Sequence, residues 1–425
     1  MRSLIQSTQY GGSGIVKLAF VGCGYVFDIY MRTLRAHPEL EVCGVFDIDA
    51  NRLRAVCDYY GLRSYSSYEE LLQDSNVAVV VNLTNISSHF AVSRQALLAG
   101  KHVYSEKPVT TSVEETRELF AIEKVTGAKL YSAPCNLYSD TVRTIFNAVE
   151  QGEIGKPLLV YAELDDNPIH LMDFESVRSP SGASWPLREE ILAGCTFEHV
   201  GYHVSWICAL LGPAVSVVAY SNELIDDKTK SLPGKVGTPD FSVACLTFAN
   251  GASARITCSV VAPRDHRMRV IGEKGELSSD SYRRYQADVY LEKYTKRSLT
   301  ARKFRSLRER PALGRLFGIG GSRLPLVRHW KSHAVESNYS RRAGFVQRAA
   351  DWVRRREAYA QDKMLGIAEM VRELSTGAER YLTSGFIMHV NELTLLISRA
   401  GTRGTAAAPT TTFQPIGPIP GSIVR

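Results

Sequence analysis

The sequence lacks the features that mark membrane, secreted and zinc-binding proteins. No apolar run reaches the ~18 residues that a membrane-spanning helix requires, and the first residues lack the long apolar region and cleavage site of a signal peptide. The eight cysteines stand singly, with no Cys-x-x-Cys pair and no Cys/His cluster at zinc spacing, so we expect buried, reduced thiols. These absences predict a cytoplasmic protein with no membrane partner.

An excess of one charge is confined to a single stretch of the chain. The formal net charge is +7, and residues 283–342 alone hold sixteen Lys and Arg against four Asp and Glu. This stretch has neither the aromatic-stacking pattern nor the zinc-finger pattern of nucleic-acid-binding proteins, so we expect no nucleic-acid partner. We interpret it as a solvated basic insertion. The alternative is a surface that attracts an anionic substrate, such as a nucleotide-linked sugar.

The chain of 425 residues is too long for one ordinary hydrophobic core, so two domains are expected. Residues 17–135 alternate short apolar strands with amphipathic helices, two of which begin with capping boxes at 67–70 and 112–115. This alternation predicts an α/β fold whose N-terminal part is a Rossmann domain with a doubly wound parallel sheet. Residues 1–16 are expected to be a flexible lead into the first strand.

Residues 136–400 show a different pattern, in which short alternating strands predominate. The Asn250-Gly251 turn predicts a hairpin between two of these strands. The pattern predicts a C-terminal α+β domain with a largely antiparallel open sheet, interrupted by the basic insertion at 283–342. Further helices are expected at about 343–356, 360–376 and 386–399. Residues 401–425, rich in Ala, Thr and Pro, are expected to be a disordered tail.

Ligands of doubly wound sheets bind at the carboxyl ends of the strands. Gly22 and Gly24 follow the first strand and would let a pyrophosphate approach the N–H groups of Tyr25 and Val26 at the start of a helix. Asp47 lies 25 residues beyond Gly22, at the end of the second strand. Its carboxylate can accept hydrogen bonds from an adenosine ribose and would repel a 2′-phosphate, which predicts NAD rather than NADP. The alternative is that Asp47 only caps a turn.

Several longer strings carry a more specific signal. They are Asn82–His89, Ala96–Pro108, Gln151–Pro157, Phe248–Ala252, Ile271–Gly275, Leu365–Glu369 and His389–Leu393. In the second string, an Ala-Gly-Lys-His-Val turn leads into Glu-Lys-Pro. In this order the strings resemble the Gfo/Idh/MocA family of NAD(P)-dependent oxidoreductases, over about residues 17–280 and 343–400.

The resemblance implies a set of functional residues in the first domain. Lys107 would point into the cleft beside the nicotinamide and hydrogen-bond the substrate oxygen, with Glu106 and a cis Pro108 fixing its direction. Glu106 and Lys107 are also implied to contact the cofactor, together with Thr84, Asn85 and His89. Asn136, at the crossover into the second domain, matches a position that often touches substrate.

In the second domain the family places an Asp-x-x-x-His pair on a helix that faces the nicotinamide. His203 matches the family's histidine and is predicted to be the general base for alcohol oxidation, or the acid for carbonyl reduction. His199 stands where the family usually has Asp, four residues earlier on the same predicted helical face. That pair is expected to be catalytic and to bind substrate. A packing role stays open, and a metal site lacks an evident third ligand.

The resemblance implies hydride transfer between a nicotinamide and a secondary alcohol or ketone of a sugar, cyclitol or nucleotide-linked sugar. The alternative is a nicotinamide-binding ligand sensor or regulatory partner without turnover. Polar loops that could line the substrate side are Asp165–Asn167 with His170, Ser184–Pro186 and Ala262–Arg267. The family's open sheet pairs with another subunit, so a homodimer or homotetramer is expected.

Overall fold

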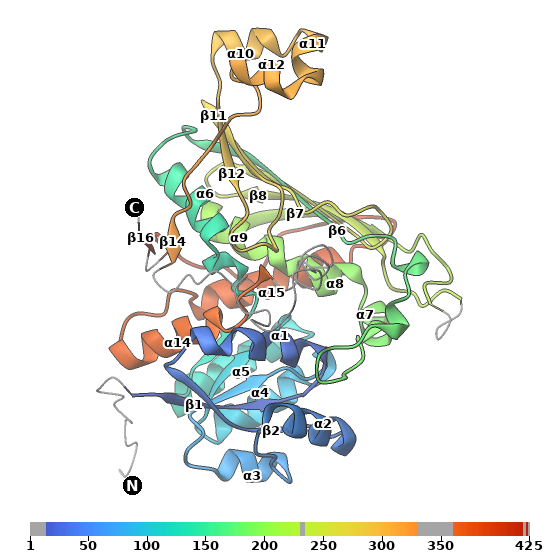
Figure 1. The fold of residues 1–425 in the computed structure, drawn as a ribbon, viewed down its shortest axis with the longest axis vertical. Coiled ribbons are helices and arrows are strands. Elements are labelled where there is room, and N and C mark those ends of the chain that lie inside the picture. The colour runs from blue at the N-terminus through green and yellow to red at the C-terminus, as the bar shows by residue number, and fades with distance from the viewer. Residues whose placement is uncertain (1–13, 230–233, 330–359, 420–421, 424–425) are drawn as a thin grey trace, which may run out of the picture.

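Short apolar segments near the start of the chain form a five-stranded parallel sheet, which lies in the lower half of Figure 1. The computed structural model describes residues 14–229, 234–329, 360–419 and 422–423. The strand order is β2-β1-β3-β4-β5, so the chain reverses its direction of travel across the sheet between β1 and β3. The strands are β1 (Val16–Val21), β2 (Leu40–Phe46), β3 (Val79–Asn82), β4 (His102–Ser105) and β5 (Leu130–Ser132). This is the predicted Rossmann topology.

Both faces of this sheet are buried, because successive strand residues join two different hydrophobic clusters. One cluster unites Ala19 and Val21 with α4 and α5, and the other unites Leu18 and Phe20 with α1 and α2. The helices are α1 (Tyr25–Thr33), α2 (Ala50–Tyr60), α3 (Tyr68–Gln73), α4 (His89–Leu98) and α5 (Val113–Thr126). The serine half of each predicted capping box is confirmed, since Ser67 accepts a hydrogen bond from Glu70 N–H and Ser112 from Glu115 N–H. The glutamate half differs, because the two carboxylates accept from the N–H groups one residue before the caps.

The second domain is built on a nine-stranded sheet with the order β13-β12-β11-β10-β6-β9-β8-β7-β15. Its strands pair antiparallel, apart from β6 and β9, which pair parallel. They are β6 (Pro157–Asp165), β7 (Ala214–Asn222), β8 (Phe241–Phe248), β9 (Ser253–Ser259), β10 (Met268–Gly272), β11 (Gly275–Ser279), β12 (Val289–Lys293), β13 (Ser322–Arg323) and β15 (Thr405–Ala407). Burial alternates along β8, so one face of the sheet is packed and the other is open. The predicted hairpin at Asn250-Gly251 joins β8 to β9.

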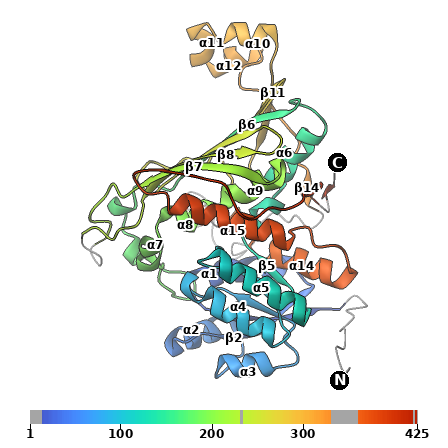
Figure 2. The same cartoon turned by 180° about the vertical axis from the view of Figure 1, so that it is seen from behind.

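Helices fill the space between the two sheets in Figures 1 and 2. They are α6 (Asp140–Glu150), α7 (Leu187–Ala193), α8 (Cys195–His199), α9 (Gly201–Leu211) and α15 (Ser384–Ser398). A further helix, α14 (Leu365–Thr376), comes late in the chain and completes the Rossmann domain, because its Ile367 and Met370 join the cluster around Leu18. The first domain therefore contains a helix from far outside residues 17–135.

Two predicted segments are corrected by the structure. The basic insertion begins later than residue 283, because β12 belongs to the large sheet; α10 (Lys296–Ala301), α11 (Arg305–Glu309) and α12 (Pro311–Leu316) then leave it. The tail is not disordered from residue 401, because β15 pairs with β7 and Phe413 is buried. A two-stranded sheet joins β14 (Arg328–His329) to β16 (Ser422–Ile423).

Some expectations fall outside the described residues. They are the helix at 343–356 and most of the lead over 1–16. Within the described ranges, no helix combines the length and the apolar character that a bilayer crossing needs.

Candidate functional site

The turn after β1 has the shape of a phosphate-binding loop. Gly22 has φ of +95°, and a Cβ there would lie 2.6 Å from the carbonyl oxygen of Leu83, so this position requires glycine. Gly24 precedes the first helical residue of α1, and a Cβ at Gly24 would meet no atom within 4 Å. The first N–H groups of α1, those of Tyr25 and Val26, have no acceptor within their own helix. Open space at Gly24 therefore lies beside the N-terminus of α1, where the helix dipole favours an anion, which fits a dinucleotide pyrophosphate.

Asp47 closes this loop from the end of β2. Its Oδ2 accepts a hydrogen bond from Cys23 N–H at 2.7 Å, and its Oδ1 accepts one from Asp49 N–H at 2.8 Å. The capping residue of α2 is Asp49, whose side chain accepts from Asn51 N–H and Arg52 N–H. The alternative, that Asp47 only caps a turn, accounts for its bond to Asp49 N–H but not for its bond to Cys23 N–H in the glycine turn. The guanidinium of Arg52 lies 3.5 Å from Asp47, with 43% of its side chain exposed.

A buried histidine, His89, holds the segment after β3 in place. Nδ1 of His89 lies 2.7 Å from the carbonyl oxygen of Pro108, and Nε2 lies 2.9 Å from that of Thr84. Both ring nitrogens are thus occupied by the backbone, so the expectation that His89 contacts the cofactor is corrected. His89 instead fixes the Thr84 turn against the Lys107–Pro108 turn. Asn85 is exposed and Thr84 half-buried, so both stay candidates for cofactor contact.

Glu106 anchors the turn that carries Lys107. Its Oε1 accepts hydrogen bonds from Tyr30 Oη at 2.9 Å and Lys363 Nζ at 3.2 Å, and its Oε2 accepts one from Lys107 N–H. Burial alone would raise the pKa of Glu106, but the two lysines and these donors lower it to about 2. Glu106 therefore positions Lys107. Its carboxylate oxygens are already bonded to groups of the protein. The Lys107–Pro108 bond is cis, as the resemblance implies.

The side chain of Lys107 reaches across to the second domain. Its ammonium donates to Oε2 of Glu198 at 2.8 Å and to the Glu198 carbonyl oxygen, and it lies 5.4 Å from the ring centroid of Tyr202. Burial would lower the pKa of Lys107, but the carboxylate of Glu198 outweighs burial and raises that pKa above its ordinary value. Lys107 is therefore a fixed cation at the junction of the two domains.

The prediction that His203 is the acid–base residue is wrong in this geometry. His203 is fully buried; its Nδ1 accepts a hydrogen bond from Trp206 Nε1–H at 2.9 Å, and its Nε2 therefore carries the proton and donates to the Glu163 carbonyl oxygen at 2.9 Å. Burial lowers the pKa of His203 to about 3. Because both of its ring nitrogens are bonded inside the protein, His203 has a packing role in this structure.

His199 occupies the site that His203 was expected to occupy. Its side chain is 12% exposed, Nε2 lies 4.0 Å from Oδ2 of Asp166, and the buried Nδ1 has no hydrogen-bond partner among the described residues. Burial, helped by the positive charges of Arg283 and Lys107, lowers the pKa of His199 to about 4 against the opposing effect of Asp166. The imidazole is thus neutral and presents a free nitrogen beside Lys107.

Asp166 gathers the polar loops of the second domain. Its carboxylate lies 2.8 Å from Arg283 and 3.5 Å from His266. Burial would raise the pKa of Asp166, but Arg283, His266 and His199 hold it well below its ordinary value. Asp166 comes from the polar loop that the sequence marked as a possible substrate contact. Arg283 was assigned to the basic insertion, and nothing local in the sequence distinguishes it.

Glu190 adds a carboxyl group near Lys107, whereas Asn136 is buried at the start of α9. Glu190 on α7 accepts a hydrogen bond from Trp185 Nε1–H, and burial together with the negative charge of Glu198 raises the pKa of Glu190 to about 8. Asn136 was expected to touch substrate, but it is 1% exposed and its Nδ2 donates to the Tyr202 carbonyl oxygen at 3.0 Å. Asn136 therefore fixes the start of α9.

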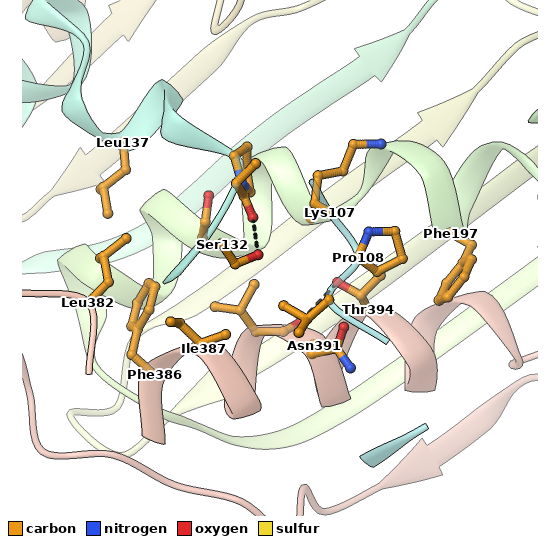
Figure 3. Close-up of a pocket in the computed structure, with 16 residues that line it drawn as sticks. Lys107, Pro108, Ser132, Leu137, Phe197, Leu382, Phe386, Ile387, Asn391 and Thr394 are labelled. Carbon is orange, nitrogen blue, oxygen red and sulfur yellow. Dashed lines mark hydrogen bonds between the residues drawn. The ribbon is translucent and has the colours of Figure 1, made fainter. Parts of the chain in front are cut away.

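A mainly apolar pocket lies behind the Lys107–Pro108 turn, against α15. Its lining includes Pro108, Phe197, Phe386 and Ile387. In Figure 3 the ammonium of Lys107 points away from the pocket wall formed by Phe386 and Ile387. Lys107 also lines this pocket, but Glu198, His199 and Asp166 do not.

Comparison with known proteins identifies relatives of both domains. The family profile described as "Oxidoreductase family, NAD-binding Rossmann fold" matches residues 16–133, and the GFO/IDH/MocA C-terminal domain matches residues 142–278. The myo-inositol 2-dehydrogenase of Thermotoga maritima is 26% identical over 273 residues, which cover 63% of this chain and 76% of that protein. The uncharacterized oxidoreductase YrbE of Bacillus subtilis is 27% identical over 274 residues, covering 63% and 75%.

Solved structures share the fold over nearly the whole chain. The WlbA dehydrogenase from Bordetella pertussis, in complex with NADH and UDP-GlcNAcA, superposes with a TM-score of 0.64 and 18% identity, covering 93% of this chain and 98% of that one. The 3-ketoreductase KijD10 from Actinomadura kijaniata, in complex with NADP and TDP-benzene, superposes with a TM-score of 0.64 and 17% identity, covering 91% and 98%.

Proposed function

The chain belongs to the GFO/IDH/MocA family of NAD(P)-dependent oxidoreductases, and from this premise we propose that it transfers a hydride between nicotinamide and a secondary alcohol or ketone of a sugar, cyclitol or nucleotide-linked sugar. The observation that carries the proposal is the fixed ammonium of Lys107 beside a neutral His199, whose Nδ1 is unpartnered among the described residues. A donor and a neighbouring acceptor are what removal of a hydroxyl proton requires.

Lys107 stabilises the substrate oxygen as its charge changes. When bound, the nicotinamide supplies the hydride acceptor or donor of the reaction. An ammonium has three N–H donors, and Glu198 accepts two of those of Lys107, through its carbonyl and carboxylate oxygens. The third donor is left to hold the substrate hydroxyl or carbonyl oxygen. Because its pKa is raised, Lys107 stays charged and acts as a hydrogen-bond donor rather than as the base.

His199 takes the proton in the oxidative direction and returns it in the reductive direction. Asp166 faces the Nε2 side of the ring at 4.0 Å and favours a proton there, which leaves the Nδ1 lone pair as the acceptor. The family's usual carboxylate before the histidine is thus replaced by one from the loop after β6. Glu190, whose raised pKa keeps it protonated at neutral pH, is the second candidate as proton donor in ketone reduction.

The substrate class follows from the relatives and from the charge around the site. One relative is named a myo-inositol 2-dehydrogenase, and one structural neighbour holds a sugar linked to UDP. Arg283 lies beside Asp166 in the same polar cluster and would attract polyhydroxyl or anionic groups.

The proposal is tested by steady-state turnover with a panel of inositols, free sugars and nucleotide-linked sugars, followed through NADH absorbance. With the substrate found, Lys107→Met and His199→Asn should each lower kcat about 10²-fold or more, the usual scale for an acid–base group, while NADH affinity is unchanged. His203→Asn should lower the melting temperature and keep most of kcat. If folded His203→Asn loses kcat and His199→Asn keeps it, His203 is the acid–base residue. If Glu190→Gln alone abolishes ketone reduction, Glu190 is the donor.

A further inference from the structure

The helices α10, α11 and α12 form a projection, residues 296–316, which we call the arm. In Figures 1 and 2 the arm stands beyond the end of the nine-stranded sheet, on the side away from the Rossmann domain. It lies outside both family matches, the second of which ends at residue 278. Neither cofactor binding nor the proposed chemistry therefore accounts for it.

Large apolar side chains are exposed on the arm rather than packed inside it. They are Leu299, Phe304, Leu313 and Leu316, with exposed fractions of 49%, 57%, 38% and 66%. Small residues occupy the interior instead: Ala301 is buried, and a Cβ on Gly314 would lie 2.7 Å from the carbonyl oxygen of Leu307. The helices thus pack closely through small residues, and the large ones remain available to a partner.

The arm is also strongly basic. It holds eight Lys and Arg residues and a single acidic residue, Glu309. Arg302 is paired with Glu292 and Arg305 with Glu309. The other six cations are exposed and have no ion pair within the described part of the chain; they are Lys296, Arg297, Lys303, Arg308, Arg310 and Arg315. Of these, Arg297 donates to the Leu316 carbonyl oxygen. The arm therefore presents positive charge together with exposed apolar side chains.

We propose that the arm binds the surface of an anionic lipid bilayer and inserts its exposed Leu and Phe side chains at the level of the headgroups. Basic side chains are attracted to anionic headgroups, and apolar side chains between them enter the acyl boundary without spanning it. A nucleic acid would match the charge but would leave the leucines exposed, and Phe304 alone is no stacking platform.

Vesicle flotation of the full-length protein tests the proposal. The protein should float with vesicles of phosphatidylcholine and phosphatidylglycerol, should not float with phosphatidylcholine alone, and should be released by high salt. Phe304→Ser/Leu316→Ser should lower the partition coefficient at least about tenfold, since two large apolar contacts are lost. The matched control, Leu98→Ser/Val125→Ser, changes residues that are 52% and 81% exposed elsewhere and should float normally. Lys303→Glu/Arg308→Glu/Arg315→Glu should abolish the preference for anionic vesicles.

NADH fluorescence titration shows that each variant is folded, because the arm is remote from the glycine turn. The proposal is overturned if the wild-type protein does not float with anionic vesicles. It is also overturned if Phe304→Ser/Leu316→Ser floats to the same extent as the wild type. It is also overturned if vesicles fail while duplex DNA binds through the same basic residues. If the wild-type protein does not bind vesicles and light scattering gives Phe304→Ser/Leu316→Ser a lower molar mass than the wild type, the proposal is also overturned. The arm would then be an interface between copies of this chain.

Discussion

At the scale of single residues, we predict that Asp47 sets the choice between NAD and NADP through its own charge and that of its neighbour Arg52. The carboxylate would repel a 2′-phosphate, whereas the exposed Arg52, 3.5 Å away, would attract one. Asp47→Ser keeps a hydrogen-bond acceptor for Cys23 N–H and removes the charge. We expect the ratio of NADPH to NADH affinity to rise about tenfold, which corresponds to about 1.4 kcal/mol. Cofactor fluorescence titration measures this ratio.

The control for Asp47→Ser is the double variant Asp47→Ser/Arg52→Ala. Without the guanidinium, the gain in NADPH affinity should be smaller, because the repulsion is removed but no cation attracts the phosphate. Equal NADH and NADPH affinities in the unmutated protein would contradict the role of Asp47.

Residues whose role depends on local backbone could be predicted from the sequence, and residues whose role depends on distant partners could not. Gly22, Gly24 and Lys107 lie where the strand–turn pattern places them. His203 was singled out by its match to the family's histidine, and the expected shared helical face of 199 and 203 is interrupted, because α8 ends at His199 and α9 begins at Gly201. The partner that fixes the Nε2 proton of His203 is the backbone of Glu163, 40 residues earlier. Lys363 was missed for the same reason, since its partner Glu106 is 257 residues away.

At the scale of elements, apolar periodicity located the strands and helices of the first domain. It did not locate the segment 405–412, here called the strap, which runs along the edge of the second domain's sheet. Residues 405–412 resemble a low-complexity tail in composition, yet β15 pairs with the edge of β7. Edge pairing is satisfied by backbone groups, which leave little trace in side-chain pattern. Likewise, α14 has an ordinary helical sequence, and nothing in it shows that it packs on the first sheet.

Glu392 on α15 holds this strap in place. Its two carboxylate oxygens accept hydrogen bonds from the N–H and hydroxyl groups of Thr410 and Thr411, at 2.6 to 2.8 Å. In Glu392→Gln an NH₂ group would face these donors, so we expect a loss of about 1–3 kcal/mol of unfolding free energy, measured by urea denaturation. Glu379→Gln, an exposed residue, is the control and should change stability little. Equal stabilities of the two variants would show that the strap contributes nothing.

At the scale of the whole molecule, a polar contact ties a late segment of the chain to the Rossmann domain. His37 lies between α1 and β2 in the first domain, and its Nε2 is 2.8 Å from the carboxylate of Asp362, 325 residues later. Its Nδ1 lies 3.5 Å from Glu39. Burial alone would lower the pKa of His37, but Asp362 and Glu39 outweigh it and raise that pKa to about 9. The segment that returns after the basic insertion is thus tied to the Rossmann domain by a protonated histidine.

This contact makes stability depend on pH in a definite direction. The folded pKa of His37, about 9, exceeds the value of about 6.5 in an unfolded chain. The stabilisation is therefore complete below about pH 6.5 and is lost as pH rises toward 9, by an amount on the order of 3 kcal/mol. His37→Gln should be less stable than wild type at pH 6, and the difference should shrink steadily up to pH 9. Melting temperatures across this range measure it.

Asp362→Asn separates the ion pair from other effects of the substitution. Without this carboxylate the pKa of His37 loses its main support against burial, so Asp362→Asn should remove most of the same pH dependence while keeping the histidine. The double variant should add little to either single one, because all three disrupt one interaction. A difference between wild type and His37→Gln that stays constant from pH 6 to 9 would mean that His37 is neutral in the folded protein. The link between the two halves of the chain would then be a neutral hydrogen bond, worth roughly 1 kcal/mol at every pH.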